Sequence, residues 1–212
     1  MADVRSRLGK LISVVGNSGV GKTTLTKELC KQFPFTTALE QHKERPFQKQ
    51  FSLDLQRYSL PNQIDYLLYR AEQEQSIRQS GMMGIQDGGL EEDFYVFTRL
   101  FYEKGYLKEQ EYRLCERMYQ LLRSLLPPPD LIIRLTAPLN VIAERYARRG
   151  RKLEIATAED LGRIETLLEQ WLGSVDSTPI ITVDASADGF APKRVKELLA
   201  LWDFAESESP TC

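Results

Sequence analysis

Residues 11–24, LISVVGNSGVGKTT, join a short apolar run to a glycine-rich turn and then to a Lys-Thr pair. The apolar run is bounded by a glycine, which predicts a buried strand of a parallel sheet. From Gly16 to Thr23 the chain fits the pattern G-x-x-x-x-G-K-[ST] without a mismatch. In this pattern backbone N–H groups at the start of a helix converge on phosphate oxygens, so the stretch predicts a nucleoside triphosphate site.

The Lys-Thr pair indicates which cofactors this site takes. Lys22 can place a point charge on the β- and γ-phosphates, and the Thr23 hydroxyl can ligate Mg²⁺, so we expect ATP or another nucleoside triphosphate together with Mg²⁺. The alternative is a glycine-rich turn that carries Lys and Thr by coincidence, but the strand before it and the helix-forming segment TLTKELCKQF after it favour phosphate binding. The expected nucleotide-binding residues are Gly16, Asn17, Ser18, Gly19, Val20, Gly21, Lys22, Thr23 and Thr24.

Composition limits the remaining possibilities. The 212 residues contain no linker-like segment, so we expect one domain over 1–205 and a disordered polar tail over 206–212. A net charge of −2 gives no basic surface for nucleic acid, which favours a small-molecule partner. No apolar run approaches the length of a membrane span and no signal segment opens the chain, so we expect a cytoplasmic protein that binds no membrane. The single histidine and the three scattered cysteines argue against a zinc site and a disulfide framework.

Strand-like and helix-like segments alternate along the whole chain. The expected strands are 11–15, 36–40, 82–86, 131–137 and 179–185, and the expected helices are 23–33, 61–78, 90–100, 109–125, 138–151, 159–172 and 192–202. This alternation predicts an α/β fold with five parallel strands and helices on both faces, a three-layer P-loop fold.

Two of the expected strands end in an acid. In a parallel sheet, ligands gather beyond the carboxyl ends of the strands. Glu40 can accept a hydroxyl proton there during phosphoryl transfer, and Asp87 can hold Mg²⁺ beside the phosphate loop. The alternatives are a solvated loop glutamate and, because glycines follow Asp87, an ordinary turn.

Two further groups of side chains are candidates for contacts with substrate. Gln63 and Arg70 lie on nearly the same side of the expected helix 61–78, and an amide can both donate to and accept from a nucleobase, although a surface glutamine is commoner. Arginines 145, 148, 149 and 151 can close over transferring phosphates as a lid at about 145–155, whereas a charge run is usually a solvated face.

The order of these motifs resembles the deoxynucleoside kinase family, P-loop enzymes that phosphorylate the 5′-hydroxyl of deoxynucleosides. The resemblance extends from about residue 11 to residue 190. It is carried by GNSGVGKTT, YSLPNQIDYLLYR, DGGLEEDFYVF, LPPPDLIIRLTAP and ERYARRGR.

The resemblance implies a role for each matching residue. Glu40 would receive the 5′-hydroxyl proton, Gln63 would pair with the base, and Asp87 would be associated with Mg²⁺. Arg70 and Asp93 match a pair beside the exocyclic group of the base, seen more in the deoxycytidine and purine branch than in the thymidine branch. The lid would contribute Arg145, Arg149 and Arg151 to the phosphates and Glu154 to the sugar 3′-hydroxyl, and the loop 185–190 would face the adenine of the donor. The family is commonly homodimeric.

The chain departs from the family pattern on the acceptor side. The motif D/E-R-S reads Asp87-Gly88-Gly89, so the arginine between the catalytic carboxylate and the 5′-oxygen is absent. Ser52 occupies the position of the tyrosine that usually holds the 3′-hydroxyl. Gln41 occupies the position of the proline that usually follows the base glutamate. The missing arginine indicates a slow enzyme, a different acceptor, or a site that another arginine reaches. Two alternatives stay open: a P-loop kinase for a nucleoside monophosphate or another small alcohol, and a nucleotide-binding module without turnover.

Overall fold

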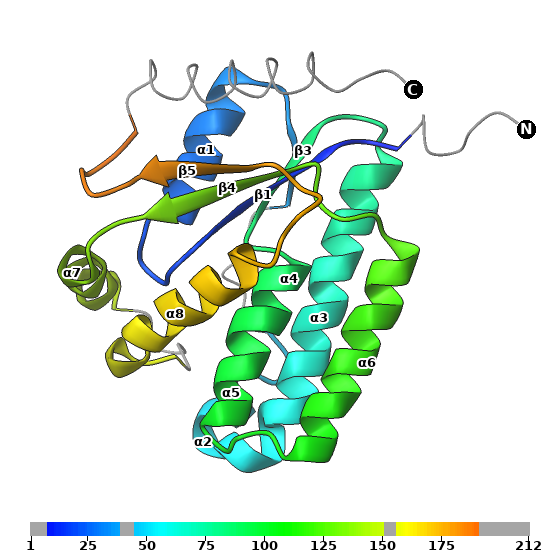
Figure 1. Ribbon diagram of the computed structural model, residues 1–212, viewed down its shortest axis with the longest axis vertical. Helices are drawn as coiled ribbons and strands as arrows, with labels where there is room; N and C mark the ends of the chain where they lie inside the picture. Colours follow the sequence, from blue (N-terminus) through cyan, green and yellow to red (C-terminus); the bar gives the residue numbers. More distant parts are fainter. Residues whose placement is uncertain (1–7, 39–44, 151–155, 191–212) are drawn as a thin grey trace, which may run out of the picture.

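The strands of the protein form one sheet in which all neighbours are parallel, in the order β2-β3-β1-β4-β5 (Figure 1). A computed structural model describes residues 8–38, 45–150 and 156–190. The strands are β1 (Leu11–Gly16), β2 (Thr36–Ala38), β3 (Gly84–Asp87), β4 (Leu131–Thr136) and β5 (Ile180–Asp184). Because the strands are parallel, their carboxyl ends lie along one edge, and the phosphate loop follows the central strand β1 at that edge.

Helices cover both faces of the sheet. They are α1 (Lys22–Gln32), α2 (Gln48–Leu53), α3 (Leu55–Gln79), α4 (Leu90–Glu92), the π-helix η2 (Asp93–Thr98), α5 (Arg99–Glu103), α6 (Glu109–Leu125), α7 (Leu139–Arg149), the 3₁₀ turn η3 (Ala158–Asp160) and α8 (Leu161–Leu172). The predicted five-stranded parallel sheet with helices on both faces is confirmed. None of the helices in the described part of the chain is long and apolar enough to span a membrane. The expected helix 192–202 and the tail 206–212 lie outside the described residues.

Alternation along the buried strands divides the core between the two faces. Ile12 and Val14 of β1 pack with Leu25 and Leu29 of α1, above the sheet in Figure 1. Val15 points to the opposite face, where one cluster combines it with residues of η2, α5 and α8. Successive side chains of a strand point to opposite faces of the sheet, so a strand that is apolar throughout is buried only when helices cover both faces. The apolar sequence of β1 therefore requires the three-layer arrangement.

The long helix α3 starts earlier than the proline in its sequence suggests. The prediction placed Pro61 in the first turn, but the helix begins at Leu55, so this boundary was wrong. Asp54 is the N-cap, and its carboxylate accepts a hydrogen bond from the Arg57 amide at 3.0 Å. This cap fixes the helix start one and a half turns before the proline, and tertiary packing outweighs the lost hydrogen bond.

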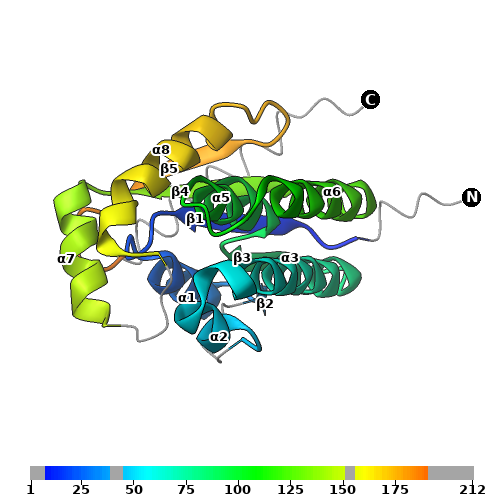
Figure 2. The same cartoon turned by 90° about the horizontal axis from the view of Figure 1, so that it is seen from below.

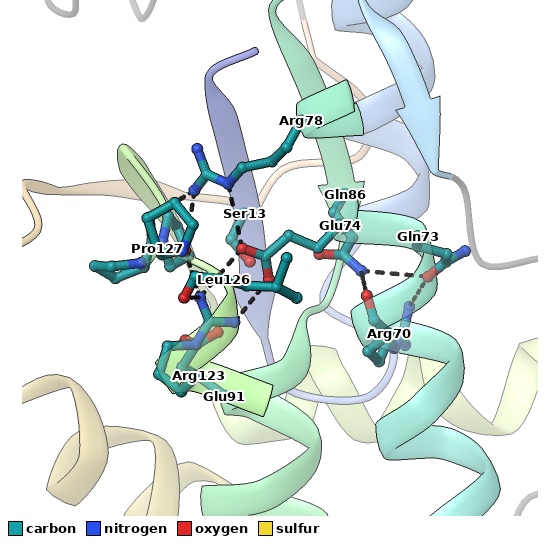
Figure 3. Close-up of polar contacts among 12 residues, drawn as sticks. Ser13, Arg70, Gln73, Glu74, Arg78, Gln86, Glu91, Arg123, Leu126 and Pro127 are labelled. Carbon is teal, nitrogen blue, oxygen red and sulfur yellow. Dashed lines mark hydrogen bonds and ion pairs between the residues drawn. The ribbon is translucent and has the colours of Figure 1, made fainter. Parts of the chain in front are cut away.

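A buried ionic network joins α3, α4 and α6 (Figure 3). Glu74, which is fully buried, pairs with Arg123 at 2.7 Å and with Arg78 at 3.4 Å. Arg123 also lies 3.0 Å from Glu91, at the start of the helix that follows β3. Burial raises the pKa of the Glu91 carboxyl, and the charge of Arg123 opposes that rise. The network thus fixes the segment after Gly88 and Gly89 against the two long helices, which run side by side in Figure 2.

Candidate active site

The phosphate loop lies between the end of β1 and the N-terminus of α1. Gly19 has φ +92, and a Cβ atom there would lie 3.1 Å from the Ile142 carbonyl oxygen of α7, so only glycine fits. Gly21 is the N-cap of α1, which makes Lys22 the first helical residue. The unpaired N–H groups and the positive end of this helix therefore face the loop, as an anion site requires.

The side chain of Lys22 folds back over this loop. Its ammonium donates to the carbonyl oxygen of Gly16 and lies 3.4 Å from that of Asn17. It also lies 3.7 Å from Oε1 of Glu92, which accepts the Gly16 N–H at 2.8 Å. The same carboxylate oxygen thus contacts both the lysine and the first glycine of the phosphate loop.

Glu92 is buried, and this changes its acid strength. Burial raises the pKa of the carboxyl to about 7, while Lys22 and the hydrogen bond from Gly16 lower it. Asp93 raises this pKa further, and Arg70 lowers it. At neutral pH the group is therefore poised between its charged and neutral forms.

Glu92→Gln is expected to change how stability depends on pH. A carboxyl whose pKa is raised on folding stabilises the protein below its unfolded pKa of about 4.5, and this contribution is lost as pH rises through about 7. The free energy of unfolding of the variant should therefore improve relative to wild type, by up to about 3 kcal/mol, between pH 4.5 and 8. Urea denaturation at both pH values measures this, with the surface variant Glu28→Gln as control. Equal differences at both pH values would contradict the prediction.

The two expected metal ligands lie next to each other. The Thr23 hydroxyl donates to Oδ2 of Asp87 at 2.5 Å, across the gap between α1 and the end of β3. Oδ1 of Asp87 is buried and has no hydrogen-bond partner among the described residues. Mg²⁺ is typically held by one or two protein oxygens plus phosphates and waters, so this orphaned oxygen and the hydroxyl fit it. Among the residues with described positions, no group of three or more His, Cys, Asp or Glu side chains forms a metal site.

The acceptor side is built from α3 and the π-helix η2. The buried Gln63 amide donates to the Thr98 hydroxyl at 2.8 Å and accepts from Asn62 at 3.2 Å, so its orientation is fixed. Arg70 pairs with Asp93 at 2.6 Å. The prediction of a plain helix over 90–100 was incomplete, because its middle turns are π-helical. The Thr98 hydroxyl donates to the Asp93 carbonyl at 2.9 Å within this widened turn, which brings both residues toward Gln63.

Of the three arginines predicted to line the phosphates from the lid, Arg145 and Arg149 lie within the described residues. The guanidinium of Arg145 donates to the carbonyl oxygens of Ala185, Ser186 and Ala187 at 2.6, 3.0 and 2.9 Å, after β5. It therefore holds the loop that was expected to face the donor adenine. Arg149 lies over the Tyr146 ring, 5.7 Å from its centroid. The predicted residues Glu40, Arg151 and Glu154 lie outside the described residues.

One cavity of 290 Å³ joins the phosphate loop to the acceptor residues. Its lining consists of Asn17, Ser18, Gly19, Gly21, Lys22, Thr23, Thr24, Gln48, Asn62, Gln63, Tyr66, Arg70, Asp87, Glu92, Asp93, Phe97, Phe101, Arg145, Arg149 and Ala156. Predicted site residues from five separate segments of the chain therefore line the same cavity. Ser52 is not among them, and its exposed hydroxyl donates to the Lys49 carbonyl oxygen within α2.

Sequence reasoning missed two features of this site. Glu92 was not singled out, although consecutive residues of a helix point in different directions, so one of the three acids 91–93 could be expected to face the core. Asn17 was expected at the nucleotide, but its side chain is buried and donates to the Leu161 carbonyl and the Glu165 carboxylate of α8 at 2.8 and 3.0 Å. The Asn17 side chain thus holds the phosphate loop against α8, and no local sequence pattern predicts that contact.

Comparison with known proteins identifies the family. The family model for deoxynucleoside kinases matches residues 12–203. The chain belongs to the deoxynucleoside kinase family. It is accordingly a kinase that phosphorylates a deoxynucleoside in an ATP-dependent reaction, and the suspected family resemblance is confirmed.

Individual relatives agree with this assignment. A deoxyadenosine/deoxycytidine kinase of Bacillus subtilis (strain 168) is 30% identical over 174 residues, which cover 81% of this chain and 80% of the relative. A deoxyadenosine kinase of Dictyostelium discoideum is 32% identical over 150 residues, covering 71% of this chain and 61% of that protein.

Solved structures show the same fold. The deoxyadenosine kinase of M. mycoides with the products dCMP and a flexible dCDP bound has a TM-score of 0.76 at 24% identity, over 92% of this chain and 99% of that one. The same enzyme with bound dATP also gives 0.76, at 23% identity, over 91% of this chain and 99% of that one. The deoxynucleoside kinase fold described above is thus shared over nearly the whole chain.

Proposed function

We propose that this deoxynucleoside kinase transfers the γ-phosphoryl group of ATP to the 5′-hydroxyl of a deoxynucleoside inside the 290 Å³ cavity. The observation that carries the proposal is the continuity of this cavity from Lys22 and Thr23 to Gln63 and Asp93. A donor held by its phosphates at one end and an acceptor held by its base at the other would meet between them. Positioning and charge stabilisation are the main levers of phosphoryl transfer, and such a cavity provides both.

On the donor side, the loop N–H groups and the start of α1 bind the phosphates, and Lys22 neutralises charge on the β- and γ-phosphates. Thr23 and Asp87 would hold Mg²⁺, which would neutralise part of the negative charge on the phosphates. Arg149 and Arg151 would contact the transferring phosphate from the lid. Arg145 would act through the loop 185–190, since its guanidinium holds the carbonyl oxygens of that loop.

On the acceptor side, Glu40 accepts the 5′-hydroxyl proton as the O–P bond forms, and Glu154 contacts the sugar 3′-hydroxyl. Gln63 pairs with the base through its fixed amide. Asp93 presents a carboxylate to the exocyclic group, which favours the amino donors of adenine and cytosine over a carbonyl oxygen. The names of the Bacillus subtilis and Dictyostelium relatives support the same preference for deoxyadenosine and deoxycytidine.

A panel of acceptors tests this proposal. The protein is incubated with labelled ATP, Mg²⁺ and each deoxynucleoside, ribonucleoside and nucleoside monophosphate. We expect products from deoxyadenosine and deoxycytidine. Transfer only to monophosphates would support the alternative kinase, and no transfer despite ATP binding would support a binding module.

Glu40→Gln is expected to lower kcat by about 10²–10⁴-fold, because general base catalysis is lost while the phosphate loop is intact. ATP affinity, measured by calorimetry, should stay within about twofold of wild type. The matched control is Glu28→Gln on the surface of α1, where Glu28 pairs with the exposed Lys31 at 2.6 Å. Unchanged turnover in Glu40→Gln would remove this residue from the base role.

The exposed face of α6 supports a homodimer. Leu114, Leu121 and Leu125 are 42%, 61% and 71% exposed and follow helical spacing, and Leu68 of the neighbouring α3 is 42% exposed. Scattered apolar residues are common on surfaces, but three exposed leucines on one face of a helix favour a subunit interface. Sedimentation equilibrium tests this proposal, and a monomer at micromolar concentration would contradict it.

A further inference from the structure

The space beside Gly88 is already filled by side chains from elsewhere. Gly88 has φ +79, and a Cβ atom there would lie 2.9 Å from Oε2 of Glu92 and 3.0 Å from Nη2 of Arg70. The Cζ atom of Arg70 would lie 3.4 Å away. The guanidinium of Arg70 therefore stands where the side chain of residue 88 would begin.

Arg70 is held firmly in this place. Its Nε donates to Asp93 at 2.6 Å, and its Nη1 donates to the Asp87 carbonyl oxygen at 2.8 Å and lies 3.4 Å from the Gln73 amide oxygen. The Gln86 amide donates to the Arg70 carbonyl oxygen at 3.2 Å and to Gln73 at 3.3 Å (Figure 3). The side chain is 5% exposed. A guanidinium fixed by several acceptors needs no rearrangement to stabilise charge nearby.

The position of Arg70 also relates it to the donor side. It bonds the backbone of Asp87, whose carboxylate accepts from the phosphate-loop hydroxyl of Thr23 at 2.5 Å. Arg70 thus lies at the end of β3, and it lines the same cavity as the phosphate loop and Gln63. Arg145, by contrast, holds the loop after β5. Buried charge acts through a lower effective dielectric than exposed charge, so Arg70 is well suited to stabilise negative charge in this cavity.

We propose that Arg70 is a catalytic residue that supplies, from α3, the positive charge absent at position 88. The inference rests on the proposed function, in which the acceptor hydroxyl is phosphorylated in this cavity. The acceptor O–P bond forms, the bond between the γ-phosphorus and the β–γ bridging oxygen breaks, and the hydroxyl proton passes to Glu40. Arg70 keeps its proton throughout and stabilises the negative charge on the reacting oxygens. Its pairing with Asp93 leaves it in contact with the base subsite as well.

Variants that remove the arginine at position 70 and introduce one at position 88 test this proposal. Arg70→Ala should lower kcat about 10²-fold with both deoxyadenosine and deoxycytidine, since a lost charge contact acts on the transition state whatever the base. Gly88→Arg alone should not raise the wild-type rate, because Arg70 already fills the space. The double variant Arg70→Ala with Gly88→Arg should recover at least about tenfold in kcat over Arg70→Ala with Gly88→Ala, which carries the same backbone strain.

Three outcomes would overturn the proposal: a change confined to KM, no recovery in the double variant, or a faster enzyme from Gly88→Arg alone. If Arg70→Ala does not give a folded protein in thermal unfolding, Arg70→Lys serves instead, with an expected loss of about tenfold in kcat because the fork geometry is lost. An unchanged kcat in Arg70→Lys would then overturn it. A wild-type protein without kinase activity on any deoxynucleoside would contradict the proposed function, whereas an active wild type with these results contradicts only the role of Arg70.

Discussion

Lys22→Met is expected to lower kcat by about 10²–10³-fold, the range for removing one preorganised group that stabilises charge in the transition state. Met matches the apolar stem of Lys out to Cε, with sulfur in place of Cδ, and lacks the ammonium. In the structure this ammonium lies inside the phosphate loop, against the Gly16 and Asn17 carbonyl oxygens. It is therefore well placed for the role proposed above, the neutralisation of charge on the β- and γ-phosphates.

The same substitution should affect Glu92. Lys22 is the largest influence that lowers the pKa of this buried carboxyl, so its loss should raise that pKa further and leave the group neutral at pH 7. ATP binding should weaken less than turnover, because the loop N–H groups and the helix start are backbone features that Met leaves in place.

Steady-state kinetics and calorimetric titration with ATP measure the two effects separately. The matched control is Lys31→Met at the exposed end of the same helix, where Lys31 pairs with Glu28 at 2.6 Å. Surface pairs contribute at most about 1 kcal/mol, so the control should keep wild-type kcat. A Lys22→Met variant with kcat within threefold of wild type would show that the phosphate charge is neutralised by other groups.

Arg123→Met is expected to reduce the free energy of unfolding by about 3–5 kcal/mol, a large part of the 5–15 kcal/mol typical of a domain. Arg123 contacts two buried carboxylates, Glu74 at 2.7 Å and Glu91 at 3.0 Å. Its removal takes away the ion pair of Glu91 with Arg123, and among the described residues Glu74 keeps its pair with Arg78 at 3.4 Å. An uncompensated buried charge costs much more than the pair contributes.

Urea denaturation measures this loss. Arg113→Met, on the exposed face of the same helix, removes two surface ion pairs at 2.8 and 2.9 Å and should change stability by no more than about 1 kcal/mol. Adding Glu91→Gln to Arg123→Met should recover part of the loss, because it removes one unpaired acid. Equal effects of Arg123→Met and Arg113→Met would mean that the network contributes no more than a surface pair.

Much of the fold follows from patterns that are local in the sequence. The apolar runs that became β1 and β4 bury both faces, and the glycines of the phosphate loop adopt backbone angles that other residues avoid. Helix ends were less predictable: α3 starts at Leu55, after the Asp54 cap, and residues 93–98 form a π-helix in which Thr98 accepts a hydrogen bond from Gln63. Neither a cap before a proline nor a π-turn has a strong periodic signal.

The phosphate-loop motif and the family resemblance could be read from the sequence alone, because both depend on residues that are neighbours along the chain. The arrangement of charges on the acceptor side depends on the tertiary fold. The fold brings Glu92 to the Gly16 amide across 76 positions and Arg70 to the Asp87 carbonyl across 17. Ion pairs and close approaches of this kind are set by how helices pack on the sheet, which a pattern of residue types does not specify. The missing arginine at position 88 could be read from the sequence, and the guanidinium that lies beside that glycine could be found only in the fold.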